Sequence, residues 1–298
     1  MITAPTHPRA AALCMVGSMA LLGFVDNFIA TIAETISLWQ FLSVRFVLAA
    51  PLVLLLAIAG LGSLRPKRLW AVALRSLLVG SGVMCYFAAL AVMPIAQALA
   101  GLFTSPIFVL ILSAAFLRRR IGPWRIAAVA LGFAGTLIVL GVGQDWPGPV
   151  MLLPVAGGLL YACGSIATRE LCAEESTLVM LLGILATQLI IGTVMLSVLA
   201  VADPASITFL TRPWTWPMTE ALPYVALQAV ISVAGVFLLI RAYQWGEASQ
   251  VSALEYTIMI FGPAFAYLLF GVPITGVMLL GIALIMAAGV IIALRSRP

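Results

Sequence analysis

The residues of this sequence that could do chemistry are a few charged side chains inside long apolar runs. Arg45 and Glu255 stand out, because an ionised side chain at a bilayer centre costs roughly 2.5–3.5 kcal/mol on insertion scales. At about 1.5 Å per helical residue, they lie about 12 Å and about 10 Å deep from opposite faces. Asp26, beside Asn27, lies nearer the end of its run. These groups predict a binding site for a small zwitterionic or charged molecule.

Uncharged polar side chains within the same runs are further candidates. A tyrosine offers a ring face and a hydroxyl, and a glutamine offers an amide, although both also serve structure by bridging membrane helices. Arg45 could likewise clamp helices through backbone carbonyls. Glu255 could exchange a proton, whereas facilitated diffusion needs no such group. The uncharged candidates are Tyr86, Tyr161, Tyr256, Gln97, Gln188 and Gln228.

Catalytic and metal-binding patterns are missing from the sequence. We find no Walker A sequence, HExxH, GxSxG or dinucleotide glycine fingerprint, which speaks against an enzyme and against an intrinsic ATP-driven pump. The single histidine, His7, lies in a polar tail, and the four cysteines show no CxxC pair. We therefore expect no catalytic residues, no cofactor and no metal. A structural or sensory membrane protein that transports nothing stays open as an alternative.

The elements that position these residues are membrane-spanning helices. The chain of 298 residues is 64% hydrophobic and 8% charged, far from the roughly 25% charged residues of soluble domains. A spanning helix needs about 20 apolar residues. Breaking the two longest runs at Pro94 and at Gly271–Pro273 gives ten spans and an all-α integral membrane fold. The runs are Ala10–Ala30, Ser37–Ala59, Ser76–Leu117, Ile126–Gln144, Trp146–Thr168, Ser176–Ala202, Ala221–Ile240 and Ala248–Leu294.

The basic residues predict the orientation of these spans. Thirteen of the fifteen Lys and Arg fall in every second gap between apolar runs or at the two ends of the chain, and the exceptions are Arg45 and Arg212. Lysine and arginine concentrate in cytoplasmic loops, so we expect both termini in the cytoplasm and the loop 203–220 outside. This sidedness explains the net charge of +5 better than nucleic-acid binding does.

An internal repeat divides the chain into residues 1–145 and 146–298. Residues 86–98 can be laid on 239–251, and residues 127–139 on 281–293, at offsets of 153 and 154. Five spans per half is an odd number, so the second half enters the membrane inverted relative to the first. Inverted repeats are a common construction of secondary transporters that alternate access to a site between the halves.

These features resemble the drug/metabolite transporter superfamily. The resemblance rests on the inverted halves, on the segment 40–46 (QFLSVRF) with its intramembrane arginine, on Pro94–Pro106 and on the glycine-rich fifth and tenth helices. The chain is most similar to the EamA-like branch and to its bacterial YddG-type amino-acid exporters. This resemblance implies a secondary transporter in the bacterial inner membrane that exports small amino acids, aromatic and apolar ones included, or related metabolites.

Two further expectations follow from the resemblance and the residues. Export of lipophilic cations or drugs, with Glu255 as the charge partner, is the alternative function. The fifth and tenth helices carry closely spaced small residues, which let membrane helices approach closely. These helices should lie apart from the substrate cavity and pack on each other or on a second copy, so the protein is a monomer or a weak homodimer. The remaining partners are the lipid bilayer and a zwitterionic substrate.

Overall fold

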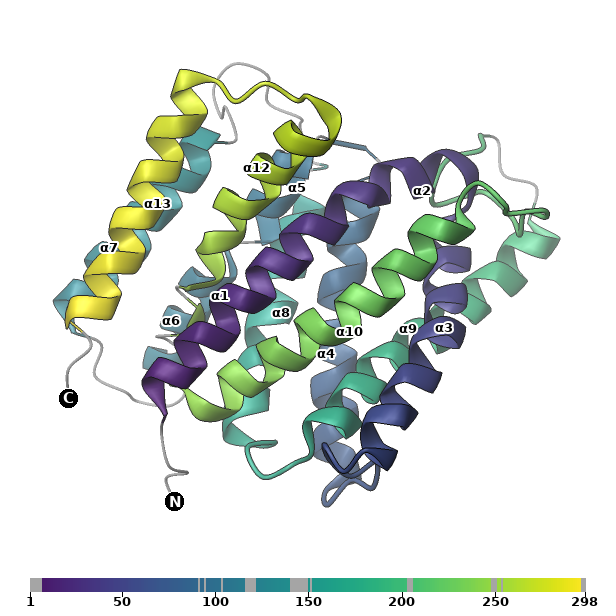
Figure 1. Ribbon diagram of the computed structural model, residues 1–298, viewed down its shortest axis with the longest axis horizontal. Helices are drawn as coiled ribbons and strands as arrows, with labels where there is room; N and C mark the ends of the chain where they lie inside the picture. The colour runs from purple at the N-terminus through teal and green to yellow at the C-terminus, as the bar shows by residue number, and fades with distance from the viewer. Residues whose placement is uncertain are drawn as a thin grey trace.

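The computed structural model describes residues 7–90, 92–93, 95–102, 104–115, 122–139, 150, 152–202, 206–247, 251–252 and 254–295. Within these ranges the regular elements are all helices, as expected (Figure 1). They are α1 (Pro8–Val25), η1 (Asp26–Phe28), α2 (Ile29–Thr35), α3 (Leu38–Ile58), α4 (Leu69–Ala89), α5 (Ile95–Leu102), α6 (Ser105–Ala115), α7 (Pro123–Val139), α8 (Leu152–Glu170), α9 (Thr177–Val201), α10 (Leu222–Trp245), η3 (Glu255–Thr257), α12 (Ile258–Phe270) and α13 (Gly276–Arg295).

Six helical stretches of the described chain are long and apolar enough to cross a membrane: α1 with η1 and α2, then α3, α4, α8, α9 and α10. Four shorter apolar helices lie within α6, α7, η3 with α12, and α13. Helical structure is interrupted between α4 and α5 and between α12 and α13, the two places where the sequence predicts that proline ends a span. Gly271, at φ 67°, ends α12 in the left-handed region. The ten-span arrangement itself remains a prediction.

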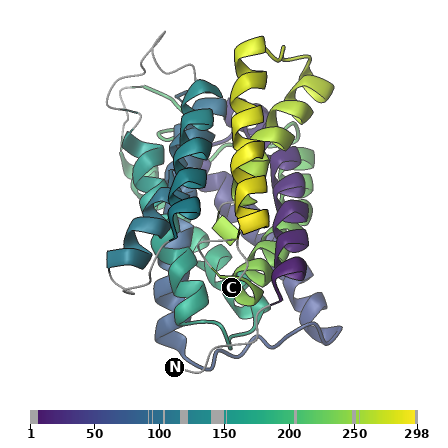
Figure 2. The same cartoon turned by 90° about the vertical axis from the view of Figure 1, so that its left-hand side faces the viewer.

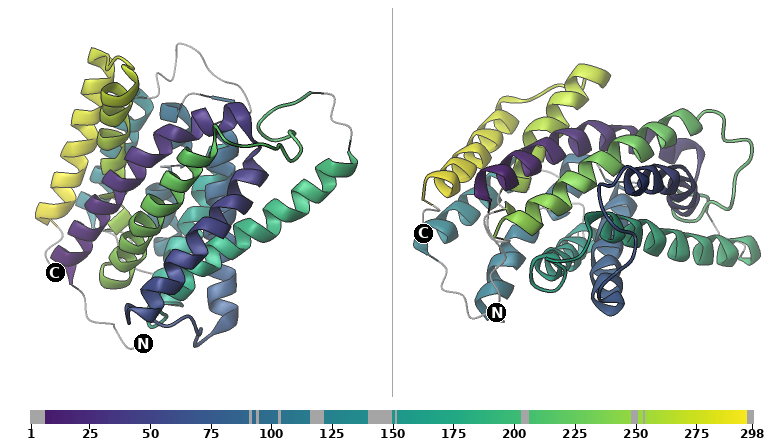
Figure 3. Two further views of the ribbon diagram at one scale, coloured as in Figure 1. Left: turned by 45° about the vertical axis from the view of Figure 1, so that its right-hand side comes forward. Right: turned by 60° about the horizontal axis from the view of Figure 1, so that its bottom comes forward.

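The long helices pack in pairs that join distant parts of the chain. α1 lies along α10, α3 along α9, and α4 along α8, as the views in Figure 3 illustrate. Glycine allows the close approach of α4 and α8: a Cβ on Gly82 would lie 2.8 Å from the carbonyl oxygen of Gly157. Such backbone contacts through small residues are typical of membrane helix interfaces.

Helices α7 and α13 form a separate pair at one edge of the molecule (Figure 2). A Cβ on Gly135 would lie 2.6 Å from the carbonyl oxygen of Gly281, so the two backbones touch. The helices expected to be the fifth and tenth spans therefore pack on each other, which is one of the two arrangements expected for them. Their link to the bundle includes Tyr256, whose ring would lie 2.8 Å from a Cβ on Gly132.

The loop from residue 206 to 221 is fastened to one end of the bundle. The Gln40 amide exchanges two hydrogen bonds with the backbone of Thr215, at 2.8 and 2.9 Å. Arg212 donates to the carbonyl oxygens of Ala33 and Ile36 at 3.0 and 3.3 Å. The lone basic residue of this loop therefore satisfies backbone groups where α2 ends.

The turn between α8 and α9, which contains Glu175, lies at the end of the bundle where α1 begins and α13 ends (Figure 1). The Glu175 carboxylate accepts hydrogen bonds from the backbone N–H groups of Lys67 and Arg68, at 2.9 and 2.7 Å, where α4 begins.

The sequence places Arg75 among the basic loop residues, and the structure corrects this. It is 1% exposed inside α4 and donates to Thr168 at 2.8 Å. The basic residues Arg118–Arg120 lie outside the described ranges.

Candidate functional site

A cavity lies at the centre of the helix bundle, between helices from both parts of the chain. Its volume is about 90 Å³, which is room for a few water molecules. Most of its wall is apolar. Its lining residues are Met19, Leu22, Asp26, Arg45, Val79, Val83, Tyr86, Phe87, Leu99, Leu102, Tyr161, Ile184, Gln188, Gln228, Val236, Leu239 and Ile258.

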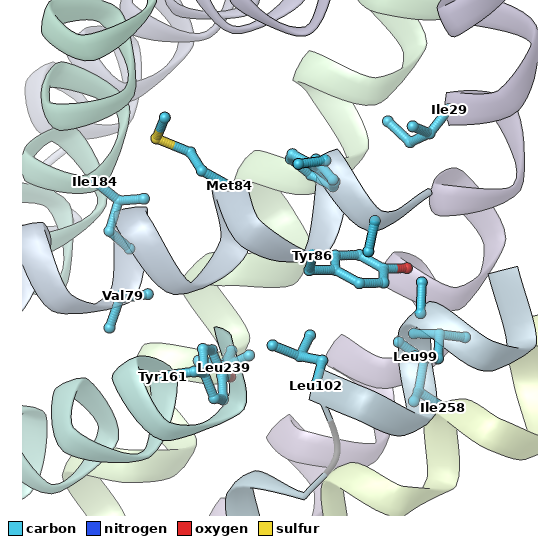
Figure 4. Close-up of a cluster of buried hydrophobic side chains, with 14 of the residues drawn as sticks. Ile29, Val79, Met84, Tyr86, Leu99, Leu102, Tyr161, Ile184, Leu239 and Ile258 are labelled. Carbon is cyan, nitrogen blue, oxygen red and sulfur yellow. The ribbon is translucent and has the colours of Figure 1, made fainter. Parts of the chain in front are cut away.

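The aromatic part of the wall comes largely from α4 and α8. Tyr86 and Phe87 follow each other on α4 with ring centroids 5.5 Å apart, and Tyr161 is supplied by α8. In Figure 4 the hydroxyl of Tyr86 points away from Tyr161, toward the segment that contains η1. It donates a hydrogen bond to the carboxylate of Asp26 at 3.2 Å. The helix is interrupted at η1, and this turn places Asp26 on the cavity.

Arg45 enters the cavity from α3 and is 5% exposed. Its guanidinium lies beside a pair of contacting rings, with its central carbon 6.0 Å from the centroid of Phe41 and 5.9 Å from that of Phe87. These are cation–π distances. One terminal nitrogen donates to the side-chain oxygen of Gln188 on α9, at 3.2 Å. Arg45 thus has an interhelical partner, which sequence spacing could not identify.

Two opposite charges, Asp26 and Arg45, share this cavity without forming a direct ion pair. Among the described residues the one ion pair within 4.0 Å joins Lys67 and Glu174 at the surface. The charged atoms of Asp26 and Arg45 are therefore more than 4.0 Å apart. A molecule seated between them could therefore meet a carboxylate on one side and a guanidinium on the other.

Glu255 lies behind the cavity wall rather than on it. It begins η3, is fully buried, and accepts hydrogen bonds on one oxygen from Tyr243 at 2.7 Å and from Tyr161 at 3.0 Å. Its second oxygen has no hydrogen-bond partner in the described part of the chain. Tyr161 lines the cavity, so one hydroxyl separates the carboxylate from it.

Two other predicted residues, Asn27 and Tyr256, do not line the cavity. Asn27 donates to the carbonyl oxygens of Gly23 and Gly262, at 2.6 and 3.2 Å, and so joins α1 to α12. Tyr256 is buried against α7. Gln97 belongs to α5, and its side chain lies outside the described part of the structure.

The structure therefore brings Asp26, Arg45, Tyr86, Tyr161 and Gln228 to one cavity. Two of its features were missed from the sequence. Tyr243 on α10 holds Glu255, but nothing distinguished it from other tyrosines near a span end. The aliphatic wall includes Leu99, Leu102 and Ile258. The sequence could not identify these residues, because every span contains many apolar residues of the same kind. An apolar pocket with a few fixed polar groups is the usual form of a small-molecule site.

Comparison with known proteins agrees with this architecture. A sequence model of the EamA-like transporter family matches residues 9–141 and again residues 148–294. A riboflavin transporter of Rhizobium johnstonii is 31% identical over 78% of this chain and 73% of its own length. A riboflavin transporter of Vibrio cholerae is 26% identical over 94% of this chain and 91% of its own length. A solved crystal structure has the same fold, with a TM-score of 0.75 at 20% identity, over 98% of this chain and 99% of that one.

Proposed function

This chain belongs to the EamA-like transporter family, and from that premise we propose that it carries riboflavin or a related flavin across the membrane. It is a multi-pass membrane protein of a family of small-molecule transporters, not of enzymes. The similarity to riboflavin transporters suggests the substrate class. The observation that carries the proposal is the composition of the cavity wall.

That wall suits a planar, uncharged heteroaromatic molecule. Tyr86, Phe87 and Tyr161 supply aromatic faces, aliphatic side chains supply most of the remaining surface, and the amides of Gln188 and Gln228 supply neutral polar atoms. A flavin has a flat apolar ring at one end of its tricycle and hydrogen-bonding groups at the other. The cavity holds a few waters only, so the surrounding helices must separate to admit a tricycle.

The packing supports alternating access between two inverted halves, 1–145 and 146–298. If α1 to α7 and α8 to α13 are each taken as five spans, exchanging the halves converts the α1–α10 pair into the α8–α4 pair. The α3–α9 and α7–α13 pairs map onto themselves. The breaks between α5 and α6 and at η3 also correspond, since they fall in the fourth span of each half. From the sidedness of the basic residues and the family's bacterial members we infer that the protein lies in the inner membrane with both termini in the cytoplasm.

The test is flavin flux in proteoliposomes. Purified protein is reconstituted, riboflavin is loaded on one side, and its fluorescence is followed on the other. We expect saturable flux well above that of protein-free liposomes, and loading each side in turn gives the direction. Absence of flavin movement from either side would refute the proposal.

Export of amino acids is the second candidate, and one observation favours it. Asp26 and Arg45 line the same cavity and could bind the ammonium and carboxylate of a zwitterion. Labelled threonine, methionine and phenylalanine in the same liposomes distinguish the two functions. Support for export of lipophilic cations is weaker, because Glu255 is held by two tyrosines behind the wall.

A further inference from the structure

Three polar atoms on the cavity-lining residues are buried without hydrogen-bond partners in the described structure. They are the Nε of Arg45, the amide nitrogen Nε2 of Gln188 and the amide oxygen Oε1 of Gln228. Each side chain is at most 5% exposed. An unmet buried polar atom costs roughly 1–3 kcal/mol, and native proteins retain few of them. A cluster of three in one cavity points to a ligand that completes them.

The donor and acceptor roles of these atoms are set by their chemistry. A guanidinium has no acceptor, so Arg45 can contact Gln188 only through the glutamine oxygen, as observed. This contact leaves the Gln188 amide nitrogen as a donor. The Nε of Arg45 is a second donor, and the Gln228 oxygen is an acceptor. The free set is therefore two donors and one acceptor.

The three residues also share one side of the cavity. Arg45 lies on α3, Gln188 on α9 and Gln228 on α10, and each of these helices packs on the other two. The remaining wall includes Leu99 and Leu102 of α5, a helix whose main contacts are with α8 and α4. The unmet hydrogen-bonding atoms thus belong to one side of the cavity, and the α5 side is apolar; Asp26 and the Tyr86 hydroxyl, on other helices, bond to each other.

We propose that Arg45, Gln188 and Gln228 form a subsite for an imide edge, in which a ring N–H lies between two carbonyl groups. The Gln228 oxygen accepts from the imide N–H, and the two donors bind the flanking carbonyls. This assignment rests on the proposed function, because the pyrimidine ring of a flavin carries such an edge. Its dimethylbenzene ring then faces the apolar side of the cavity.

The experiment compares three flavins in wild-type proteoliposomes. Riboflavin and 5-deazariboflavin both keep the imide N–H, whereas 3-methylriboflavin replaces it with a methyl group. We expect flux of 3-methylriboflavin to fall by about tenfold, the effect of one unmet buried hydrogen bond, and flux of 5-deazariboflavin to stay within about twofold. Equal flux of riboflavin and 3-methylriboflavin would overturn the subsite while leaving flavin transport intact. If no flavin moves, the proposed function fails first.

A variant assigns the contact to its residue. In Gln228→Leu, riboflavin flux should fall by about tenfold, whereas the residual flux of 3-methylriboflavin should change less than twofold, because the bond is already missing. Gln244→Leu is the matched control, since Gln244 is a buried glutamine bonded to Thr177 and Glu175 away from the cavity. It should not discriminate between the flavins. An equal loss for both flavins in Gln228→Leu contradicts the assignment.

Discussion

Replacing Arg45 by methionine separates a binding role of this residue from a structural one. The change removes a hydrogen bond to a charged group, worth about 1.5–3 kcal/mol, and two aromatic contacts of about 0.5–1 kcal/mol each. It also removes the cost of holding a charge within the membrane, about 2.5–3.5 kcal/mol. The lost contacts and the removed cost of the charge cancel to within about 2–3 kcal/mol, so the variant should still fold. Transport should not, because the guanidinium lines the cavity.

The assay pairs thermal unfolding in detergent with flavin flux in liposomes. We expect the melting temperature of Arg45→Met to move by less than about 5 °C, while flux falls at least about tenfold. Arg241→Met is the matched control. Arg241 also lies over two rings, Phe237 and Trp245, at 5.4 and 5.5 Å, but it does not line the cavity. Its flux should stay within twofold.

Two outcomes would refute this reasoning. Flux of a stable Arg45→Met variant at the wild-type level would show that the guanidinium does not bind substrate. Unfolding of that variant would show that Arg45 mainly clamps α3 to α9, the structural alternative that the sequence leaves open. Arg45→Lys adds a further test, because lysine keeps the charge but not the planar fork of donors. If hydrogen-bond geometry matters, lysine should restore stability without restoring flux.

Three other changes test the packing, the loops and the energy coupling. Gly82→Ala should destabilise the protein by about 1–3 kcal/mol, since its Cβ would meet backbone at 2.8 Å, whereas Gly17→Ala, with 3.5 Å to a side chain, should be tolerated; equal melting temperatures would contradict the close approach. Glu175→Ala should cost about 1–2 kcal/mol by removing the acceptor of two backbone N–H groups at the start of α4, while Glu174→Ala, which loses a surface ion pair, should cost less than about 1 kcal/mol. Glu255→Gln keeps an oxygen for its two tyrosines but cannot exchange a proton. Riboflavin exchange without a pH gradient should continue, and any stimulation of wild-type flux by a pH gradient should disappear in the variant. Unchanged stimulation would exclude proton coupling through Glu255.

The sequence predicted the helices well because apolar length decides them. The predicted run Ser37–Ala59 became α3, Leu38–Ile58, and the run Ser176–Ala202 became α9, Thr177–Val201. It did not predict the turn η1, which interrupts the first helix at Asp26. The expected span ended near there, whereas helix continues to Thr35. Local patterns register the end of an apolar run but not a brief change of helix type within it.

The candidate site shows where such reasoning ends. A charge inside an apolar run is visible in the sequence because its cost demands a reason, and this is how Arg45 and Glu255 were found. Only one of them lines the cavity; the other is held behind it by tyrosines from α8 and α10. Depth along a helix follows from counting residues, but the direction of a side chain depends on its neighbours in space. For Glu255 these are Tyr161, 94 residues earlier in the chain, and Tyr243, near the end of α10.

Glutamines pose the opposite problem. A membrane glutamine often bridges helices, so the sequence named Gln188 and Gln228 as candidates without deciding between a binding role and a structural one. The structure separates them by the state of single atoms: the Gln244 amide bonds to protein at both ends, whereas Gln188 and Gln228 each leave a buried atom unmet. Because burial without a partner is costly, those atoms require a partner that the described chain does not supply. The chemistry of that partner, two acceptors and one donor, is therefore a stronger guide to the substrate than the charges that first drew attention.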